Sequence, residues 1–203
     1  MAKLKMTASV VSQAQLAEGI YDLRLKAPEI ASQAAAGQFV SVYSKDGSRL
    51  LPRPISLCGI DKEAGQLRLV YRVAGAGTEE FSALKAGDTV DILGPLGNGF
   101  SLLEGKKAFL IGGGIGIPPM LQLAKELCAL NGSEMVQSVI GYRDSQLFLK
   151  DEFEAYGPVY TATEDGSRGT KGNVLNAIRE NGLTADVIYA CGPTPMLRAL
   201  KAY

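Results

Sequence analysis

A glycine-rich run near the middle of the chain has the composition of a phosphate-binding loop. Gly112-Gly113-Gly114-Ile115-Gly116 follows the apolar run Ala108-Phe109-Leu110-Ile111 and precedes a helical pattern. Such a loop exposes backbone N–H groups at a helix start, where the helix dipole favours the negative charge of a pyrophosphate. The alternative is a tight strand-to-helix turn, but four glycines are more than a turn requires. The run departs from the GxGxxG fingerprint at Ile117.

Two short motifs in the first half of the chain also suit an anion. Arg53-Pro54-Ile55-Ser56 combines an arginine, which can pair with phosphate, and a serine, which can hydrogen-bond a polar ring edge. Gly75-Ala76-Gly77-Thr78 is a glycine turn that leads into a short helical stretch. Each motif alone is equally typical of an ordinary strand start or hairpin turn. Together with the run at 112–116, they predict two dinucleotides, one for each half of the chain.

A further candidate position is Cys191, in the Cys191-Gly192-Pro193 segment that ends the last predicted strand. Open α/β sheets bind ligands at the carboxyl ends of their parallel strands. The cysteine there either faces the site or is a small buried residue. Arg143 and Asp144 follow another predicted strand and leave the nucleotide open. An arginine would meet the 2′-phosphate of NADP, whereas a carboxylate would accept hydrogen bonds from the ribose diol of NAD.

The amino-acid composition excludes several classes of site. The 203 residues include no histidine, which removes imidazole bases, catalytic triads and histidine metal ligands. Cys58, Cys128 and Cys191 are far apart and form no CxxC pair, so we expect no metal site and no disulfide framework. Unpaired cysteines favour the reducing cytoplasm. The 21 basic and 21 acidic residues balance, which argues against nucleic acid or a membrane surface as partner.

The first hundred residues have the pattern of short β-strands. We expect six strands, bounded by Gly, Pro or Asp, at residues 7–17, 19–27, 38–44, 55–61, 66–73 and 89–93. In the fifth, Leu67, Leu69 and Tyr71 alternate with their neighbours at the period of a half-buried strand. With one short helical stretch near Thr78–Leu84, this succession predicts a small antiparallel β-barrel.

The second half alternates between buried strands and helices. We expect strands at 108–111, 136–142, 159–163 and 187–190, and helices at 118–130, 149–156, 173–181 and from about Pro195. This alternation is typical of a parallel sheet with right-handed crossovers. The longest uncharged stretch, Ala108–Ala124, contains four glycines and two prolines, so it is no membrane helix. The predicted fold is therefore a six-stranded antiparallel β-barrel domain, residues 1–102, followed by an α/β nucleotide-binding domain, residues 103–203.

These motifs, in this order, resemble the ferredoxin–NADP reductase superfamily, whose members join an FAD-binding barrel to a nicotinamide-binding α/β domain. Val70-Tyr71-Arg72 and Gly94-Pro95-Leu96-Gly97 complete the set. Within the superfamily, the chain is most similar to the electron-transfer subunits of NAD-dependent bacterial dihydroorotate dehydrogenases. Three further segments carry this closer resemblance: Gly116-Ile117-Pro118-Pro119-Met120-Leu121, Leu147-Phe148-Leu149-Lys150-Asp151-Glu152-Phe153 and Glu164-Asp165-Gly166-Ser167-Arg168-Gly169.

The resemblance implies a site residue at each matching position. The positions implied to hold FAD are Arg53, Pro54, Ile55, Ser56, Val70, Tyr71, Arg72, Gly77 and Thr78. The positions implied to border the nicotinamide nucleotide are Gly113, Gly114, Gly116 and Cys191. Arg53, Gly77 and Thr78 would face phosphates, while Ser56 and Cys191 would lie near the reacting rings. Ile55 is aliphatic where plant-type reductases have an aromatic residue that stacks on the flavin.

The implied activity is electron transfer, in which NAD(H) is the substrate and FAD does the chemistry without a side-chain acid or base. The implied partner is a catalytic flavoprotein subunit that oxidises dihydroorotate in pyrimidine biosynthesis, in a cytoplasmic hetero-oligomer. The family's subunit continues into a cysteine-rich module that binds a 2Fe-2S cluster, and this chain lacks those ligands. Two alternatives stay open: a free-standing NAD(P)H reductase of ferredoxin, flavodoxin or another carrier, and a non-catalytic nucleotide-binding module.

Overall fold

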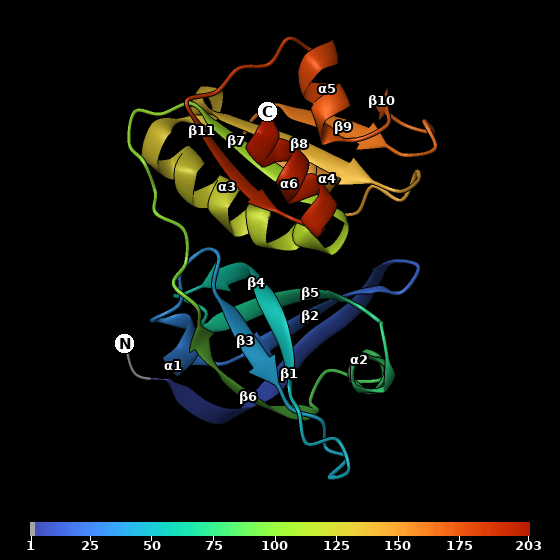
Figure 1. Ribbon diagram of the computed structural model, residues 1–203. Helices are drawn as coiled ribbons and strands as arrows, with labels where there is room; N and C mark the ends of the chain where they lie inside the picture. The colour runs from blue at the N-terminus through green and yellow to red at the C-terminus, as the bar shows by residue number, and fades with distance from the viewer. Residues whose placement is uncertain (1–2) are drawn as a thin grey trace. The chain divides into compact units, whose positions relative to one another are not determined.

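The chain divides between Phe100 and Ser101 into two units, in a computed structural model that describes residues 3–203 (Figure 1). Each unit has its own cluster of buried apolar side chains. The first unit is built mainly of strands, and the second alternates strands and helices. The two rhythms in the sequence therefore correspond to two separate hydrophobic cores.

The first unit is a closed six-stranded barrel whose neighbouring strands are all antiparallel, as predicted. Around the barrel the strands follow the order β1-β2-β5-β4-β3-β6. Their bounds are β1 Leu4–Ala17, β2 Ile20–Lys26, β3 Phe39–Val42, β4 Arg53–Asp61, β5 Gln66–Arg72 and β6 Thr89–Leu96. Two short helices accompany them, α1 (Pro28–Ala31) and α2 (Ala76–Ser82).

The barrel core follows from the alternation of side chains along its strands. Leu23 of β2 stands opposite Leu69 of β5, and Leu25 stands opposite Leu67, with all four side chains at most 1% exposed. Because successive side chains of a strand point to opposite faces, these pairs fill the interior while their neighbours face outward. The interior is thus packed with leucines, and a ligand has to bind at the barrel's outer surface.

The second unit is a five-stranded parallel sheet in the order β10-β9-β8-β7-β11. Its strands are β7 Ala108–Gly113, β8 Val136–Tyr142, β9 Val159–Thr163, β10 Thr170–Lys171 and β11 Val187–Cys191. Its α-helices are α3 Pro118–Asn131, α4 Lys150–Glu154, α5 Val174–Glu180 and α6 Thr194–Ala202, with 3-10 turns η1 Gly114–Gly116 and η2 Ser133–Met135. This arrangement confirms the predicted α/β class.

Strand β7, which lies between β8 and β11, is buried along its whole length, because helices cover both faces of the sheet (Figure 1). Phe109 and Ile111 pack with residues of α5 and α6, including Ile178 and Leu200. Helix α3 packs along β7 and β8 and ends at Asn131, where Gly132 adopts a φ of 89° and stops it. The continuous apolar pattern of β7 is therefore that of a strand between two helical layers.

Some predicted boundaries differ from the observed ones. Helix α1 and strand β10 are too short to produce a periodic pattern, and neither was predicted. Strand β6 continues to Leu96, beyond the predicted end at Leu93, because it pairs with β1 at Gly94 and with β3 at Leu96. Pairing with neighbouring strands, which no local pattern reports, extends the strand through a Gly-Pro sequence.

Candidate functional site

The two predicted anion motifs of the barrel meet in space. Arg53 is the first residue of β4, and Gly77 lies in the first turn of α2. A Cβ on Gly77 would stand 2.9 Å from Arg53 Nε and 3.4 Å from its Cζ, so the guanidinium lies across the bare glycine. Arg53 Nη1 also donates a hydrogen bond to the carbonyl oxygen of Leu51, at 2.8 Å. A cation is thereby held beside a glycine turn, which is the combination that an anionic diphosphate requires.

Thr78 shapes this turn from within. Its Oγ1 donates to the carbonyl oxygen of Gly75 at 2.9 Å and accepts from the backbone N–H of Ala74 at 2.9 Å and of Gly75 at 3.2 Å. The hydroxyl is therefore committed to the turn itself. On the other side, a Cβ on Gly75 would meet nothing within 4 Å. Hydrogen bonds of the Thr78 hydroxyl thus hold the turn closed, and the space beside Gly75 is open. A dinucleotide phosphate fits such a turn.

The remaining residues of the first motif lie along β4, on alternate sides. Pro54 pairs with Ser41 of β3 and is exposed. Ile55 is partly buried against the barrel core, so its side chain is turned inward. Ser56 follows on the other side of the strand and is half-buried. Its hydroxyl is therefore on the side of the strand that faces away from the core.

The side chain of Tyr71 is part of the barrel core. It is 2% exposed, its hydroxyl donates to Gln13 Oε1 at 3.0 Å, and its ring stacks on Tyr21 with centroids 6.0 Å apart. Burial, with Tyr21 beside it, raises the pKa of Tyr71 above its ordinary value, so the phenol stays protonated. Val70 is also buried, whereas Arg72 is exposed. Among residues 70–72, only Arg72 therefore presents its side chain to solvent, and Tyr71 can reach a ligand only through its backbone.

Sequence reasoning missed several residues that hold these motifs in place. Gln13 links Tyr71 to the end of α2, since its Nε2 donates to the carbonyl oxygens of Phe81, Ser82 and Leu84. A pocket of about 650 Å³ opens beside the start of α2, lined by Lys45, Asp46, Arg49, Ala76, Glu79 and Glu80. Apart from Ala76, none of these residues belongs to a recognisable motif, and only closure of the barrel brings Lys45, Asp46 and Arg49 to the turn.

In the second unit, the glycine run and Cys191 lie together at the carboxyl ends of two parallel strands. Cys191 of β11 is the register partner of Gly112 of β7. A Cβ on Gly116 would stand 2.3 Å from the carbonyl oxygen of Cys191, so the two backbones are in direct contact. This edge of the sheet is where open α/β folds bind nucleotides.

Packing within the protein accounts for most glycines of this run. A Cβ on Gly112 would stand 2.9 Å from Ile117 Cα, and one on Gly113 would stand 2.7 Å from Met196 Sδ. Gly114 has a φ of 54°, a conformation that few L-residues adopt. The number of glycines is therefore explained by close backbone approach, and the nucleotide assignment depends on the position of the loop instead.

Cys191 is half-buried, and burial raises the pKa of its thiol above the ordinary value. The thiol is therefore neutral near pH 7, which suits a residue that packs beside a ring and not a nucleophile. No group of three or more His, Cys, Asp or Glu side chains within residues 3–203 is arranged to hold a metal ion. Across the same residues, no helix is both long enough and apolar enough to cross a membrane.

The loop after β8 holds the two residues that leave the choice of nucleotide open. Arg143 is exposed, and Asp144 accepts hydrogen bonds from the backbone N–H of Gln146 at 2.9 Å and from its side chain at 3.3 Å. The loop after β9 joins this one, because the N–H of Asp165 donates to the carbonyl oxygen of Arg143 at 3.3 Å. The carboxylate of Asp144 is thus held in a turn at the carboxyl edge of the parallel sheet.

Two family models match the two units. The oxidoreductase FAD-binding domain matches residues 7–100, and the oxidoreductase NAD-binding domain matches residues 110–202. The FAD-binding match precedes the NAD-binding match along the chain, which is the order that the sequence motifs predict.

Curated relatives match nearly the whole chain. The dihydroorotate dehydrogenase B (NAD(+)) electron transfer subunit of Bacillus caldolyticus is 46% identical over 197 residues, which cover 95% of this chain and 76% of the relative. The subunit of the same name from Streptococcus mutans is 45% identical over 199 residues, covering 96% and 76%.

Solved structures share the fold. That of an NADH-dependent reduced ferredoxin–NADP oxidoreductase, studied for flavin-based electron bifurcation, has a TM-score of 0.85 at 32% identity and covers 96% of this chain and 71% of its own. An Amycolatopsis cytochrome P450 reductase has a TM-score of 0.82 at 24% identity, covering 98% and 65%, and is similar in fold.

Proposed function

This chain belongs to the family of dihydroorotate dehydrogenase B (NAD(+)) electron transfer subunits, and from that premise we propose which residues hold its cofactors and which partner it serves. It is an oxidoreductase with an FAD-binding and an NAD-binding domain. It passes electrons between a partner protein and NAD+ through FAD, a role that belongs to pyrimidine biosynthesis.

We propose that the FAD diphosphate lies at the turn Gly75–Thr78, and the observation that carries this assignment is Arg53 lying across Gly77. Arg53 would supply a charge-assisted hydrogen bond, and α2 begins in a turn that Thr78 keeps closed, where the first backbone N–H groups of a helix lack partners within the helix. Ser56, half-buried on β4, would donate to or accept from a polar edge of the flavin ring.

The proposed flavin surface also includes the ends of β4 and β5. Pro54, which is exposed, would lie under the ring. Ile55, whose side chain is turned inward, would border the ring through its backbone, as would Val70 and Tyr71, whose side chains are buried. Arg72 is the exposed member of that strand end and would lie beside the ribityl chain. The aliphatic Ile55 cannot stack on the flavin as an aromatic ring would.

We propose that the nicotinamide nucleotide binds at the edge formed by Gly113, Gly114, Gly116 and Cys191. Asp144, held by Gln146 in the loop after β8, would accept hydrogen bonds from the ribose diol of NAD, as the family name indicates. The proposed domains are residues 1–102 for FAD and 103–203 for NAD, close to the division between Phe100 and Ser101.

The protein's own contribution to the chemistry is positioning. When bound, FAD supplies the capacity to exchange a hydride with the nicotinamide and single electrons with a carrier. No side-chain acid or base is needed for these transfers, which agrees with a chain that contains no histidine. Arg53 would neutralise phosphate charge, and the carboxyl edge of the parallel sheet would receive the nicotinamide nucleotide. Ser56 and Cys191 are the side chains proposed to lie nearest the reacting rings.

The proposed partner is a catalytic flavoprotein subunit that oxidises dihydroorotate, bound in a hetero-oligomer. The support is the name of the relatives, which are electron transfer subunits and so have a catalytic counterpart. We also propose that the protein works in the cytoplasm, where thiols stay reduced, since no disulfide joins Cys58, Cys128 or Cys191, which all lie within the described residues.

Co-expression with a dihydroorotate-oxidising subunit tests this function. We expect a yellow complex of the two chains, and a purified chain whose flavin absorbance disappears on anaerobic addition of NADH. A chain that remains colourless after incubation with FAD would contradict the assignment. A chain that binds flavin and reacts with NADH but never associates with the partner would contradict only the partner.

A second candidate is a reductase that works with ferredoxin. It is favoured by the similarity, at 32% identity, to an NADH-dependent reduced ferredoxin–NADP oxidoreductase. Reduction of ferredoxin by NADH through this chain, at a rate unaffected by the dihydroorotate-oxidising subunit, would favour this candidate over the first.

A further inference from the structure

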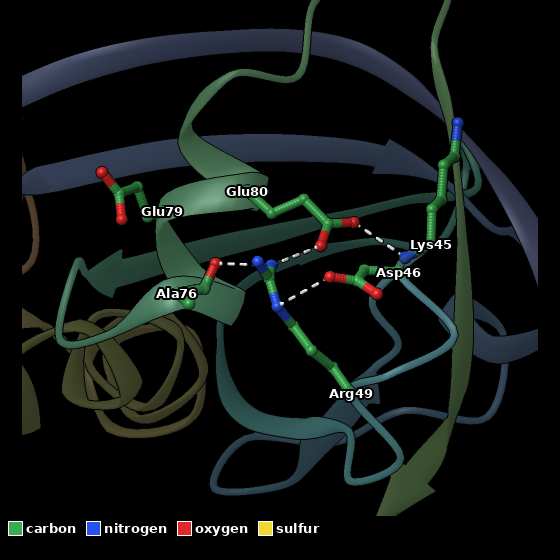
Figure 2. A pocket seen from close by; sticks show the side chains of 6 residues that line it. All are labelled: Lys45, Asp46, Arg49, Ala76, Glu79 and Glu80. Carbon is green, nitrogen blue, oxygen red and sulfur yellow. Dashed lines mark hydrogen bonds and ion pairs between the residues drawn. The ribbon is translucent and has the colours of Figure 1, made fainter.

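Glu80 of α2 holds the loop between β3 and β4 against the turn Gly75–Thr78, where the FAD diphosphate is proposed to bind. This loop, residues 43–52, contributes three donors to Glu80, and Figure 2 shows the two that come from Lys45 and Arg49. The hydroxyl of Ser44 donates to Glu80 Oε2, the backbone N–H of Lys45 donates to Oε1 at 2.7 Å, and Arg49 Nη1 donates to Oε2 at 2.8 Å. One side chain of the helix therefore holds both the beginning and the end of the loop.

Arg49 extends this contact to the first residue of the helix. Its Nη1 also donates to the carbonyl oxygen of Ala76 at 2.9 Å, and its Nε lies 3.3 Å from Asp46 Oδ2. Figure 2 shows the guanidinium lying between Glu80, Ala76 and Asp46. Ala76 is the neighbour of Gly77, so the loop is attached to α2 one residue from the glycine that Arg53 covers.

The same loop leads directly into Arg53. The carbonyl oxygen of Leu51, near the end of the loop, accepts from Arg53 Nη1 at 2.8 Å. The position of the Arg53 guanidinium is therefore set at one end by this carbonyl and at the other by Gly77. A loop that shifted on α2 would carry the carbonyl of Leu51 with it and move the guanidinium away from the turn.

The contact requires a negative charge at position 80. Burial alone would raise the pKa of Glu80, but the hydrogen bonds from Ser44 and Lys45 and the charge of Arg49 bring it below the ordinary value. A neutral amide would offer one acceptor oxygen and would turn an N–H toward Arg49 or Ser44. Arg49 in turn balances the negative charge of Glu80 beside a turn that receives a diphosphate.

We propose that Glu80 is a positioning residue for FAD, which holds the β3–β4 loop on α2 and so keeps Arg53 aligned with the glycine turn. This inference rests on the proposed function, in which that turn binds the FAD diphosphate. Glu80 itself touches neither the phosphate nor the reacting ring. Its effect is transmitted through Arg49 and the loop.

Glu79 provides a matched control. It is the adjacent carboxylate on the same helix and lines the same pocket, but its side chain is directed away from Arg49 (Figure 2). Glu79→Gln and Glu80→Gln remove the same charge at almost the same place. A difference between them therefore reports the contacts of Glu80 and not the net charge near the phosphates.

The experiment measures NADH oxidation with ferricyanide as acceptor while FAD is titrated into the apoprotein. For Glu80→Gln we expect the FAD concentration at half-maximal activity to rise about tenfold, the size of one lost charge-assisted hydrogen bond, with a much smaller change in kcat. For Glu79→Gln we expect a change of less than about twofold. Glu80→Asp, which keeps the charge, should recover part of the loss, and Ser44→Ala should show a smaller change in the same direction.

Equal FAD dependence in Glu80→Gln and Glu79→Gln would overturn the inference while leaving the proposed function intact. So would a loss in Glu80→Gln that accompanies a lower unfolding temperature of the apoprotein and reduces kcat as much as FAD affinity, because that pattern is a general loss of structure. If the unsubstituted chain bound no FAD, the proposed function and this inference would both be wrong.

Discussion

Arg53 and Gly77 lie against each other in the barrel although they belong to different motifs, and a Cβ on Gly77 would stand 2.9 Å from Arg53 Nε. Arg53 is part of a strand and Gly77 of a helix, and 24 positions separate them. This contact brings the two motifs, each a weak signal in the sequence, together in one surface that contains a cation and a glycine turn.

Arg53→Ala is expected to weaken FAD binding. Its guanidinium is the cation held at the turn, and a charge-assisted hydrogen bond to phosphate contributes about 1.5–3 kcal/mol, or about ten- to a hundredfold in affinity. Quenching of flavin fluorescence on titration of the apoprotein measures the change. Lys62→Ala, in the exposed hairpin between β4 and β5, is the control. Unchanged flavin affinity in Arg53→Ala would exclude Arg53 as a phosphate ligand.

Gly77→Ala is expected to act through Arg53. The new Cβ would displace the flexible arginine side chain, so the fold should survive while FAD affinity falls by about tenfold. In the Arg53→Ala background, the same substitution should have little effect, because the side chain that it displaces is gone. Flavin affinities of the four proteins in this double-mutant cycle give the coupling. Strictly additive losses would mean that Gly77 contacts the ligand independently of Arg53.

Gly114→Val is expected to leave FAD bound but to block reduction by NADH. Gly114 has a φ of 54° and lies at the proposed nucleotide edge, so a branched side chain is strained there and would fill space next to the nucleotide. Gly105→Val is the matched control, since Gly105 has a φ of 66° in the same unit and an added Cβ would meet nothing within 4 Å. Stopped-flow absorbance of the flavin distinguishes them. Normal NADH reduction in Gly114→Val, or equal defects in both variants, would contradict the assignment.

The thiol of Cys191 is expected to react slowly with iodoacetamide at pH 8, and faster as the pH rises through 9 and above. Burial raises the pKa of this thiol, so the reactive thiolate is scarcer at pH 8 than in an exposed cysteine. Peptide mass mapping in a Cys128→Ser background follows the reaction, because Cys58 is buried. NAD+ should slow the labelling further. Fast labelling at pH 7 that NAD+ leaves unchanged would place the thiol outside the nucleotide site.

The fold class and the order of the domains could be predicted because both are written in local patterns. The alternation of Leu67, Leu69 and Tyr71 reports a strand with one face on a core, and the unbroken run Ala108–Ile111 reports a strand between two layers of helices. Short motifs such as Arg53–Ser56 and Gly112–Gly116 identified the superfamily, since each is a contiguous segment whose order along the chain carries the resemblance.

The contacts within the candidate site could not be predicted in this way. The hydroxyl of Tyr71 donates a hydrogen bond to Gln13. The glycines at 112, 113 and 116 leave space that is taken by Ile117, Met196 and Cys191. Nothing in the residues around Glu80 shows that it receives hydrogen bonds from Ser44, Lys45 and Arg49.

The physical reason for this division is the range over which each signal acts. A residue's backbone conformation and its burial repeat with the period of its own strand or helix, so sequence alone specified the barrel, the parallel sheet and the family. The partner of a side chain depends on which strands become neighbours when the barrel closes. Only the tertiary structure therefore decided that Arg53 covers Gly77 and that Tyr71 belongs to the core. It also decided that Glu80 of α2 accepts hydrogen bonds from the loop that leads into Arg53.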